Sequence, residues 1–221
     1  MGDRIVLKWD PYHEPTASGM ELRLTYEGLL LATQGDPRNG QPDARATHKH
    51  EIRRSFHRQL KHFWATHKWL KNAQTDYPDE GRISLSESIA RRYVEYGYRF
   101  VPLVREKDNL LCSVSVLFLR REAPGGVIKS GDIDNRVKTL FDALRRPRNG
   151  YELIGNEKPQ ADEDPFFVLL EDDSLISHAV IETDVLLDPP PPGDADVSKA
   201  RLIITVNIRP YIVGLFNLSF S

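Results

Sequence analysis

The stretch "SGDIDNRVKTLFDALRRP", residues 130–147, combines an acidic opening with a short amphipathic helix. Apolar residues at helical spacing predict the buried face of this helix: Val137, Leu140, Phe141 and Leu144. Pro147 ends the helix, because proline cannot continue one. Asp132 and Asp134 stand one residue apart at its start. If this start is extended, both aspartates point to one side and Ile133 points to the core.

Two interpretations of the aspartates are open on the pattern alone. Asp134 is a preferred N-cap residue, and Lys138, four residues later, can pair with it across the helix surface. Alternatively, two hard carboxylate ligands at this spacing can hold Mg²⁺. A second acidic segment, "LLEDDSLI", places Asp172 and Asp173 directly after an apolar run. Acids are common at turns, so this segment does not decide the matter by itself.

The rest of the chain predicts an α+β fold, with helices packed on a mixed β-sheet. Alternating or continuous apolar runs predict strands at 20–32, 98–106, 109–121, 177–187 and 200–210, and a further apolar run at 166–170 leads into a turn. We expect 98–106 to form a hairpin with 109–121, and 177–187 to form a terminal hairpin with 200–210. A short helix is expected over 84–96, where Ser84 and Glu87 have capping-box spacing.

A longer helix is expected over about 47–73, with a buried stripe of Ile52, Phe56, Leu60, Phe63 and Leu70. This segment holds seven Lys or Arg residues and one Glu, although the whole chain has a net charge of −2. Two groups of basic residues are candidate contacts for DNA phosphates. They are Arg54, Arg58, Lys61 and Lys68 opposite the stripe, and Arg136, Arg145, Arg146 and Arg148 beside the acidic segments. The alternative for the first group is a solvated helix face.

Composition limits the class of protein. The 221 residues fit one domain. We expect an N-terminal extension or flexible arm over 1–19 and a single domain over 20–221, with a polar insertion at about 148–165. The only cysteine, Cys112, lies in a strand-like run and is expected to be a buried thiol in a reducing compartment. No secretory signal, membrane span, phosphate-binding loop or zinc motif is evident, so neither a membrane association nor a small-molecule cofactor is expected.

One family combines these features. "GDIDNRVKTLFDAL" followed by "EDDSLI" and a terminal β-hairpin resembles the RusA family of Holliday junction resolvases. The matching residues are Asp132, Asp134, Asn135, Lys138, Asp142-Ala143-Leu144 and Asp172-Asp173, within about residues 110–210. The resemblance implies a RusA-like core and a homodimeric, Mg²⁺-dependent endodeoxyribonuclease that hydrolyses phosphodiesters in branched DNA, leaving a 5′-phosphate.

The resemblance also implies roles for single residues. Asp132, Asp134 and Asp173 would hold Mg²⁺, or Mn²⁺ in its place, with Asp172 as a further ligand. Lys138 would lie near the scissile phosphate, which makes it catalytic together with the three ligands. The expected compartment is the cytoplasm of a bacterium, with the chain encoded by the host or by a prophage. The competing interpretation is a non-catalytic nucleic-acid-binding or structural protein of a phage or defence system with the same fold.

Overall fold

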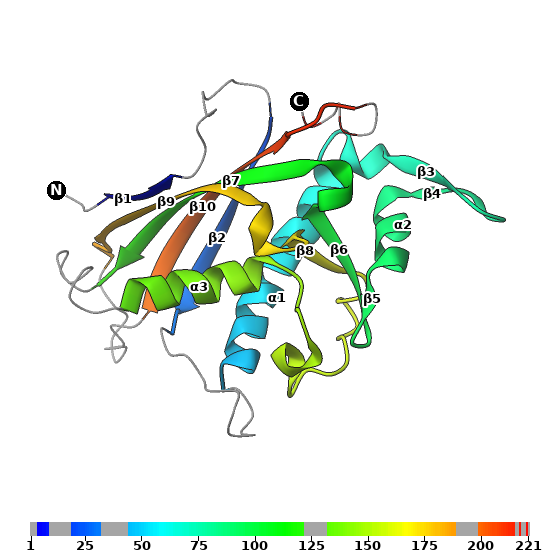
Figure 1. Cartoon of the computed structure of the whole chain (residues 1–221). Helices are drawn as coiled ribbons and strands as arrows, with labels where there is room; N and C mark the ends of the chain where they lie inside the picture. Colours follow the sequence, from blue (N-terminus) through cyan, green and yellow to red (C-terminus); the bar gives the residue numbers. More distant parts are fainter. Residues whose placement is uncertain are drawn as a thin grey trace. The chain divides into compact units, whose positions relative to one another are not determined.

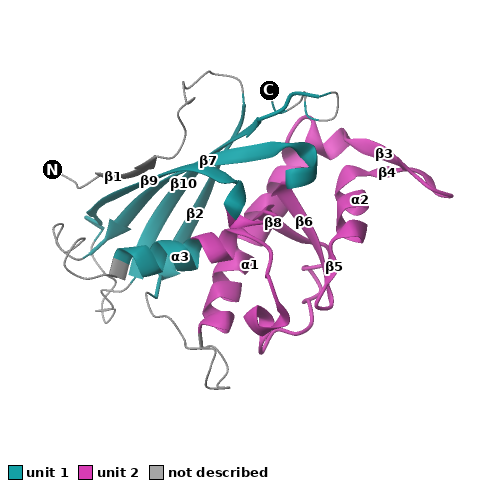
Figure 2. Ribbon diagram, viewed as in Figure 1, with its two compact units in different colours: residues 1–34, 106–140, 174–221 teal, residues 35–105, 141–173 magenta. Residues whose placement is uncertain are grey.

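The computed structural model describes residues 4–8, 19–31, 44–121, 132–188 and 199–214, together with Asn217 and Phe220. Helices and mixed sheets are both present, which confirms the α+β class (Figure 1). The chain divides into two compact units, which the sequence patterns did not indicate (Figure 2). Unit 1 comprises residues 1–34, 106–140 and 174–221, and unit 2 comprises 35–105 and 141–173. No described helix is long and apolar enough to cross a membrane.

Unit 1 is built on a five-stranded sheet with the strand order β1-β9-β7-β10-β2. In chain order its strands are β1 (Arg4–Lys8), β2 (Met20–Leu29), β7 (Leu110–Arg120), β9 (Ile176–Val185) and β10 (Lys199–Pro210). Neighbouring strands are antiparallel, except that β7 and β9 are parallel. Buried side chains alternate with more exposed ones along β7, so the two faces of the sheet differ in burial.

Both predicted hairpins are wrong. The expected terminal hairpin does not form, because β7 lies between β9 and β10 and pairs with each of them. The strand β6 (Tyr98–Val104) does not pair with β7 but belongs to a sheet of unit 2, and the 3₁₀ turn η3 (Glu106–Asp108) follows it. Apolar alternation marks a strand, but it does not select the neighbour of that strand.

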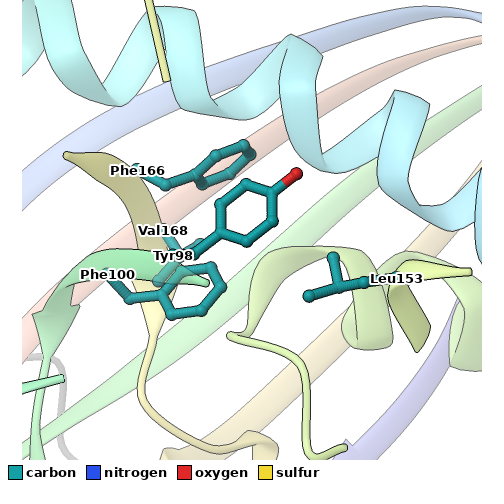
Figure 3. Packing of buried hydrophobic residues seen from close by; sticks show 5 residues of the cluster. All are labelled: Tyr98, Phe100, Leu153, Phe166 and Val168. Carbon is teal, nitrogen blue, oxygen red and sulfur yellow. The ribbon is translucent and has the colours of Figure 1, made fainter. Parts of the chain in front are cut away.

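Unit 2 packs the helix α1 (Ala44–Thr66) against a sheet with the order β5-β6-β8, where β5 is Val94–Glu95 and β8 is Phe166–Leu170. β6 and β8 are parallel and buried along nearly their whole length, as expected for strands covered on both faces. Figure 3 shows the aromatic centre of this core, formed by Tyr98, Phe100, Leu153, Phe166 and Val168.

The predicted helices form, with different ends. α1 begins three residues before the expected start at 47 and ends at Thr66; the 3₁₀ turn η2 (Leu70–Asn72) follows. Its stripe is buried as expected at Ile52, Phe56, Leu60 and Leu70, whereas Phe63 is half-buried. The helix α2 (Leu85–Arg92) is capped by Ser84, whose side chain accepts a hydrogen bond from the Glu87 backbone at 3.2 Å. A hairpin of β3 (Gln74–Tyr77) and β4 (Gly81–Ser84) was not expected.

The segment expected to be an insertion, at about 148–165, belongs to unit 2. It contains the 3₁₀ turn η4 (Gly150–Leu153), and Leu153 is buried in the core cluster. Within the expected N-terminal arm, Arg4–Lys8 form β1 and pair with β9. The other residues before Gly19 lie outside the described ranges, and the boundary at residue 20 stays a prediction.

Candidate active site

The helix α3 (Asp132–Leu144) begins at the first of the two aspartates. The expected extended start is therefore wrong, and Asp134 lies inside the first helical turn instead of capping it. Acidic residues in the first turn of a helix are favourable because of the helix dipole. The two aspartates therefore favour a helix that begins at residue 132. Positions 132 and 134 do not share a face in a helix as they would in a strand.

Asp134 and Lys138 are both exposed, and no ion pair joins them among the described residues. Ile133 is buried as expected, and Thr139 donates a hydrogen bond from its hydroxyl to the Leu31 carbonyl oxygen at 3.3 Å. These contacts hold the first part of α3 in unit 1 and leave Asp134 and Lys138 accessible to solvent. The side chain of Asp132 lies outside the described part of the structure.

Asp172 and Asp173, called the acidic pair below, follow β8 at its carboxyl end. The Glu171 amide donates to the Val104 carbonyl oxygen at 3.0 Å, so the β6–β8 pairing continues up to the residue before the pair. Asp173 opens the 3₁₀ turn η5 (Asp173–Leu175). The side chains of Asp172 and Asp173 are 36% and 33% exposed. A buried strand therefore delivers two neighbouring carboxylates to a position that solvent can reach.

Two arginines of unit 2 face the acidic pair. The Arg148 guanidinium donates to both carboxylates, and Arg145 Nε lies 4.0 Å from Asp173 Oδ2. Partial burial raises the pKa of Asp173; the two arginine charges act in the opposite direction, and the Asp172 carboxyl raises it further. The two arginines therefore offset only part of the rise in the Asp173 pKa that burial and the Asp172 carboxyl cause.

Arg145 belongs to a buried ionic network that the sequence patterns did not reveal. Its members come from α1, the end of α3 and η4: Lys49, Arg53, Asp142, Arg145 and Glu152. Arg53 is fully buried and donates to the Asp142 carbonyl oxygen at 2.9 Å and to Glu152 Oε2 at 3.2 Å. Burial lowers the pKa of Arg53 to about 10, with the Glu152 carboxylate opposing this shift. Arg53 lies outside both the buried stripe and the basic face predicted for α1. Its position directly after Ile52, a residue of the stripe, is the feature of the sequence that points to its burial.

Asp142, the aspartate of the "DAL" segment, is the centre of this network. Its carboxylate accepts from Lys49 Nζ at 2.7 Å and from Arg145 Nη2 at 2.6 Å. Desolvation would raise the pKa of Asp142, but the hydrogen bond from Lys49 and the charge of Arg145 outweigh it and hold this pKa below the usual value. The ionised form of Asp142 therefore belongs to the folded structure.

The structure leaves some of the basic residues expected to bind DNA exposed and engages or buries the others. Arg58 and Lys68 are exposed on or after α1. The others lie in internal contacts or are buried: Arg54 with Glu163, Lys61 with the Asp162 carbonyl oxygen, Arg145 in the network, Arg146 with Glu95, Arg148 with the acidic pair, and Arg136 buried in α3. Arg58 and Lys68 are consequently the cations of this set that phosphates can reach without replacing a protein contact.

Two buried histidines of α1, His50 and His57, serve the fold. His57 Nδ1 accepts a hydrogen bond from the Phe167 amide at 2.8 Å, so its Nε2 carries the proton and donates to the Asp162 carbonyl oxygen at 3.1 Å. His50 is buried beside the Tyr98 and Phe166 rings, and desolvation lowers its pKa to about 3. Both imidazoles are therefore neutral at physiological pH and hold α1 on β6 and β8.

The donor chemistry of the acidic pair fits a hard divalent cation. Adjacent carboxylates are the ligands that Mg²⁺ takes in proteins, together with water and phosphate oxygens. In this structure the pair already binds a positive group, the Arg148 guanidinium. No set of three metal-ligating side chains gathers within the described part of the chain, and the side chain of Asp132 is not in that part.

Comparisons of this chain with protein-family models, with curated proteins and with solved structures found no match.

Proposed function

We propose that the chain is a Mg²⁺-dependent, structure-selective endonuclease that hydrolyses phosphodiesters in branched DNA, including Holliday junctions. The observation that carries the proposal is the acidic pair, two accessible carboxylates held by a buried strand and already in contact with a guanidinium. In the sequence this pair follows the Asp-x-Asp-Asn segment and its lysine in the order found in RusA-like resolvases. The RusA assignment rests on that signature.

The signature assigns the cation to Asp132, Asp134 and Asp173, with Asp172 as a further ligand. If held there, Mg²⁺ would supply an activated water and would offset the negative charge that develops on the phosphoryl oxygens and on the leaving oxygen. Lys138, exposed on α3, supplies a point charge for the scissile phosphate. Arg145 contacts Asp173 from the buried network, so it holds this ligand in position rather than binding DNA.

DNA binding is assigned to exposed cations. Arg58 and Lys68 offer phosphate contacts that are independent of base sequence. We propose a homodimer, because a four-way junction presents two symmetric cleavage positions and resolution requires a cut at each. We also propose that the protein acts in the bacterial cytoplasm and is encoded by the host or by a prophage.

The test is cleavage of a labelled synthetic four-way junction, with a fork and a linear duplex of matched sequence as controls. The reactions contain Mg²⁺ or EDTA and one of three proteins: wild type, Asp132→Asn or Asp76→Asn. Asp76 is an exposed carboxylate of β3 that forms an ion pair with the exposed Arg82, so it controls for the loss of one negative charge.

The proposal predicts junction-selective cutting by wild type and by Asp76→Asn in Mg²⁺, and no cutting in EDTA or by Asp132→Asn. Cutting that persists in EDTA or in Asp132→Asn would contradict it. Binding without cutting by every protein would favour the non-catalytic nucleic-acid-binding alternative.

A further inference from the structure

Arg148 makes the most direct contact with the acidic pair. Its Nε donates to Asp172 Oδ2 at 3.1 Å and its Nη2 to Asp172 Oδ1 at 3.3 Å, and Nη2 also donates to Asp173 Oδ1. One guanidinium thus engages three of the four carboxylate oxygens of the pair. Charge-assisted contacts of this forked kind are the stronger class of protein hydrogen bonds.

The backbone around Arg148 is fixed, although its side chain is about half exposed. The Tyr96 hydroxyl donates to the Arg148 carbonyl oxygen at 2.9 Å, and the Arg148 amide donates to Glu152 Oε1 at 3.3 Å. Glu152 in turn is held by the buried guanidiniums of Arg53 and Arg145. The network therefore places the Cα of Arg148 next to the acidic pair and leaves its side chain, 52% exposed, free to turn toward solvent.

A divalent cation and the Arg148 guanidinium need the same oxygen atoms. A carboxylate oxygen that accepts a short, charge-assisted hydrogen bond does not offer the same lone pair to a metal, and two positive groups at one site repel each other. Binding of either group therefore disfavours binding of the other.

We propose that Arg148 is a built-in counter-ion of the acidic pair, which a divalent cation must displace. This inference rests on the proposed function, because it takes the acidic pair to be part of a cation site. It adds a residue that the RusA-like signature does not contain and that lies in the expected insertion, four residues after Leu144. Once displaced, the guanidinium is available to a phosphate of bound DNA, so the cation and the DNA each promote binding of the other.

The experiment is calorimetric titration of the full chain with Mn²⁺ and with Mg²⁺ in the absence of DNA. Four proteins are compared: wild type, Arg148→Gln, Asp173→Asn and Arg99→Gln. Arg99 is the matched control, because its guanidinium also bridges two carboxylates of unit 2, those of Glu87 at 2.9 Å and Asp164 at 2.7 Å. Circular dichroism of each variant checks that it is folded.

The inference predicts that Arg148→Gln binds Mn²⁺ about three- to tenfold more tightly than wild type, as expected for loss of a competing, partly exposed ion pair. Arg99→Gln should bind as wild type does, and Asp173→Asn should lose most of the binding. The direction is diagnostic: if Arg148 only shaped the turn, its replacement would weaken cation binding. Arg148→Lys, which keeps the charge and loses the fork, should fall between wild type and Arg148→Gln.

The outcomes separate this inference from the proposed function. Equal affinities of wild type and Arg148→Gln, both lost in Asp173→Asn, would overturn the role of Arg148 and leave the cation site standing. Absence of cation binding in both wild type and Arg148→Gln would overturn the inference together with the proposed function. Cation binding by Arg148→Gln but not by wild type would support the inference, because the guanidinium would then exclude the cation completely.

Discussion

The Nη2 atom of Arg53 lies 3.2 Å from Glu152 Oε2, and the Arg53 side chain is fully buried. This contact joins the long helix α1 to the 3₁₀ turn η4, which precedes the acidic pair in the chain by about twenty residues. Because Glu152 also accepts from Arg145 and from the Arg148 amide, one carboxylate organises the arginines that surround the acidic pair.

Replacing Arg53 should destabilise the protein strongly. Arg53→Leu leaves Glu152 and the Asp142 carbonyl oxygen without this donor inside unit 2, and breaking a buried pair in this way costs about 3–5 kcal/mol. Urea unfolding measures the loss. Arg58→Leu, at an exposed position of the same helix, is the control and should stay within about 0.5 kcal/mol of wild type. A loss for Arg53→Leu as small as that of the control would contradict the assigned role.

Asp142 should make the free energy of unfolding depend on pH in the acidic range. Its pKa is held below the ordinary value in the folded state, so the folded protein binds fewer protons than the unfolded chain at moderately acidic pH. The stabilisation is present above the unfolded pKa of about 3.9 and is lost as the pH falls through the lower, folded pKa. Asp142→Asn should therefore be less stable than wild type at pH 7, with a difference that narrows toward pH 3. Urea unfolding at pH 7, 5 and 3 measures this, and a constant difference would contradict it.

Cys112 should be inert in the folded protein. It lies in β7 with no exposed surface, and burial raises the pKa of its thiol to about 12. Because the thiolate is the reactive form, a chromogenic disulfide reagent should not react with native protein and should titrate one thiol in urea. Rapid reaction of the native protein would show that β7 opens far more readily than its central place in the sheet suggests.

Arg58 and Lys68 should contribute to DNA affinity through phosphates alone. Each replacement by Gln should weaken binding to junction and duplex alike and reduce the slope of log K against log salt by about 0.9. Fluorescence anisotropy at several salt concentrations gives the slope. Arg201→Gln is the control, because Arg201 is engaged by Glu27 and Asp188 on unit 1. Unchanged slopes for both the Arg58 and the Lys68 variant would remove these two residues from the proposed DNA contacts.

The sequence predicts those features that depend on residues within a single helix or strand. The stripe of α1, the Ser84 cap and the alternation of β7 follow from spacing and side-chain chemistry. Strand partners do not follow, because several strands carry interchangeable patterns. One signal was available: "YRFVPLV" and "FFVLL" are apolar without alternation, which is typical of strands covered on both faces, and these two strands form the parallel pair β6–β8.

The candidate site was predictable in its residue types but not in its contacts. Asp134, Lys138 and the acidic pair are accessible, as a catalytic site requires. Arg145 and Arg146 looked like surface cations because charged residues usually face solvent, yet the structure pairs them with Glu152 and Glu95. Those partners lie outside the signature, in the insertion and in β5, so no local pattern could reveal them.

The central claim is that Asp132 and Asp134 hold the same cation as Asp173. Fe²⁺ can take the place of Mg²⁺ at oxygen ligands. When hydrogen peroxide is added with ascorbate, bound Fe²⁺ reduces the peroxide to hydroxide and a hydroxyl radical, ascorbate restores Fe²⁺, and the radicals cut the backbone near the ligands. We predict cuts near residues 132–134 and near 171–173 in the same protein, mapped by mass spectrometry. Both sets of cuts should disappear with excess Mg²⁺ and in Asp173→Asn. Cuts confined to one of the two segments, or unaffected by Mg²⁺, would contradict the claim.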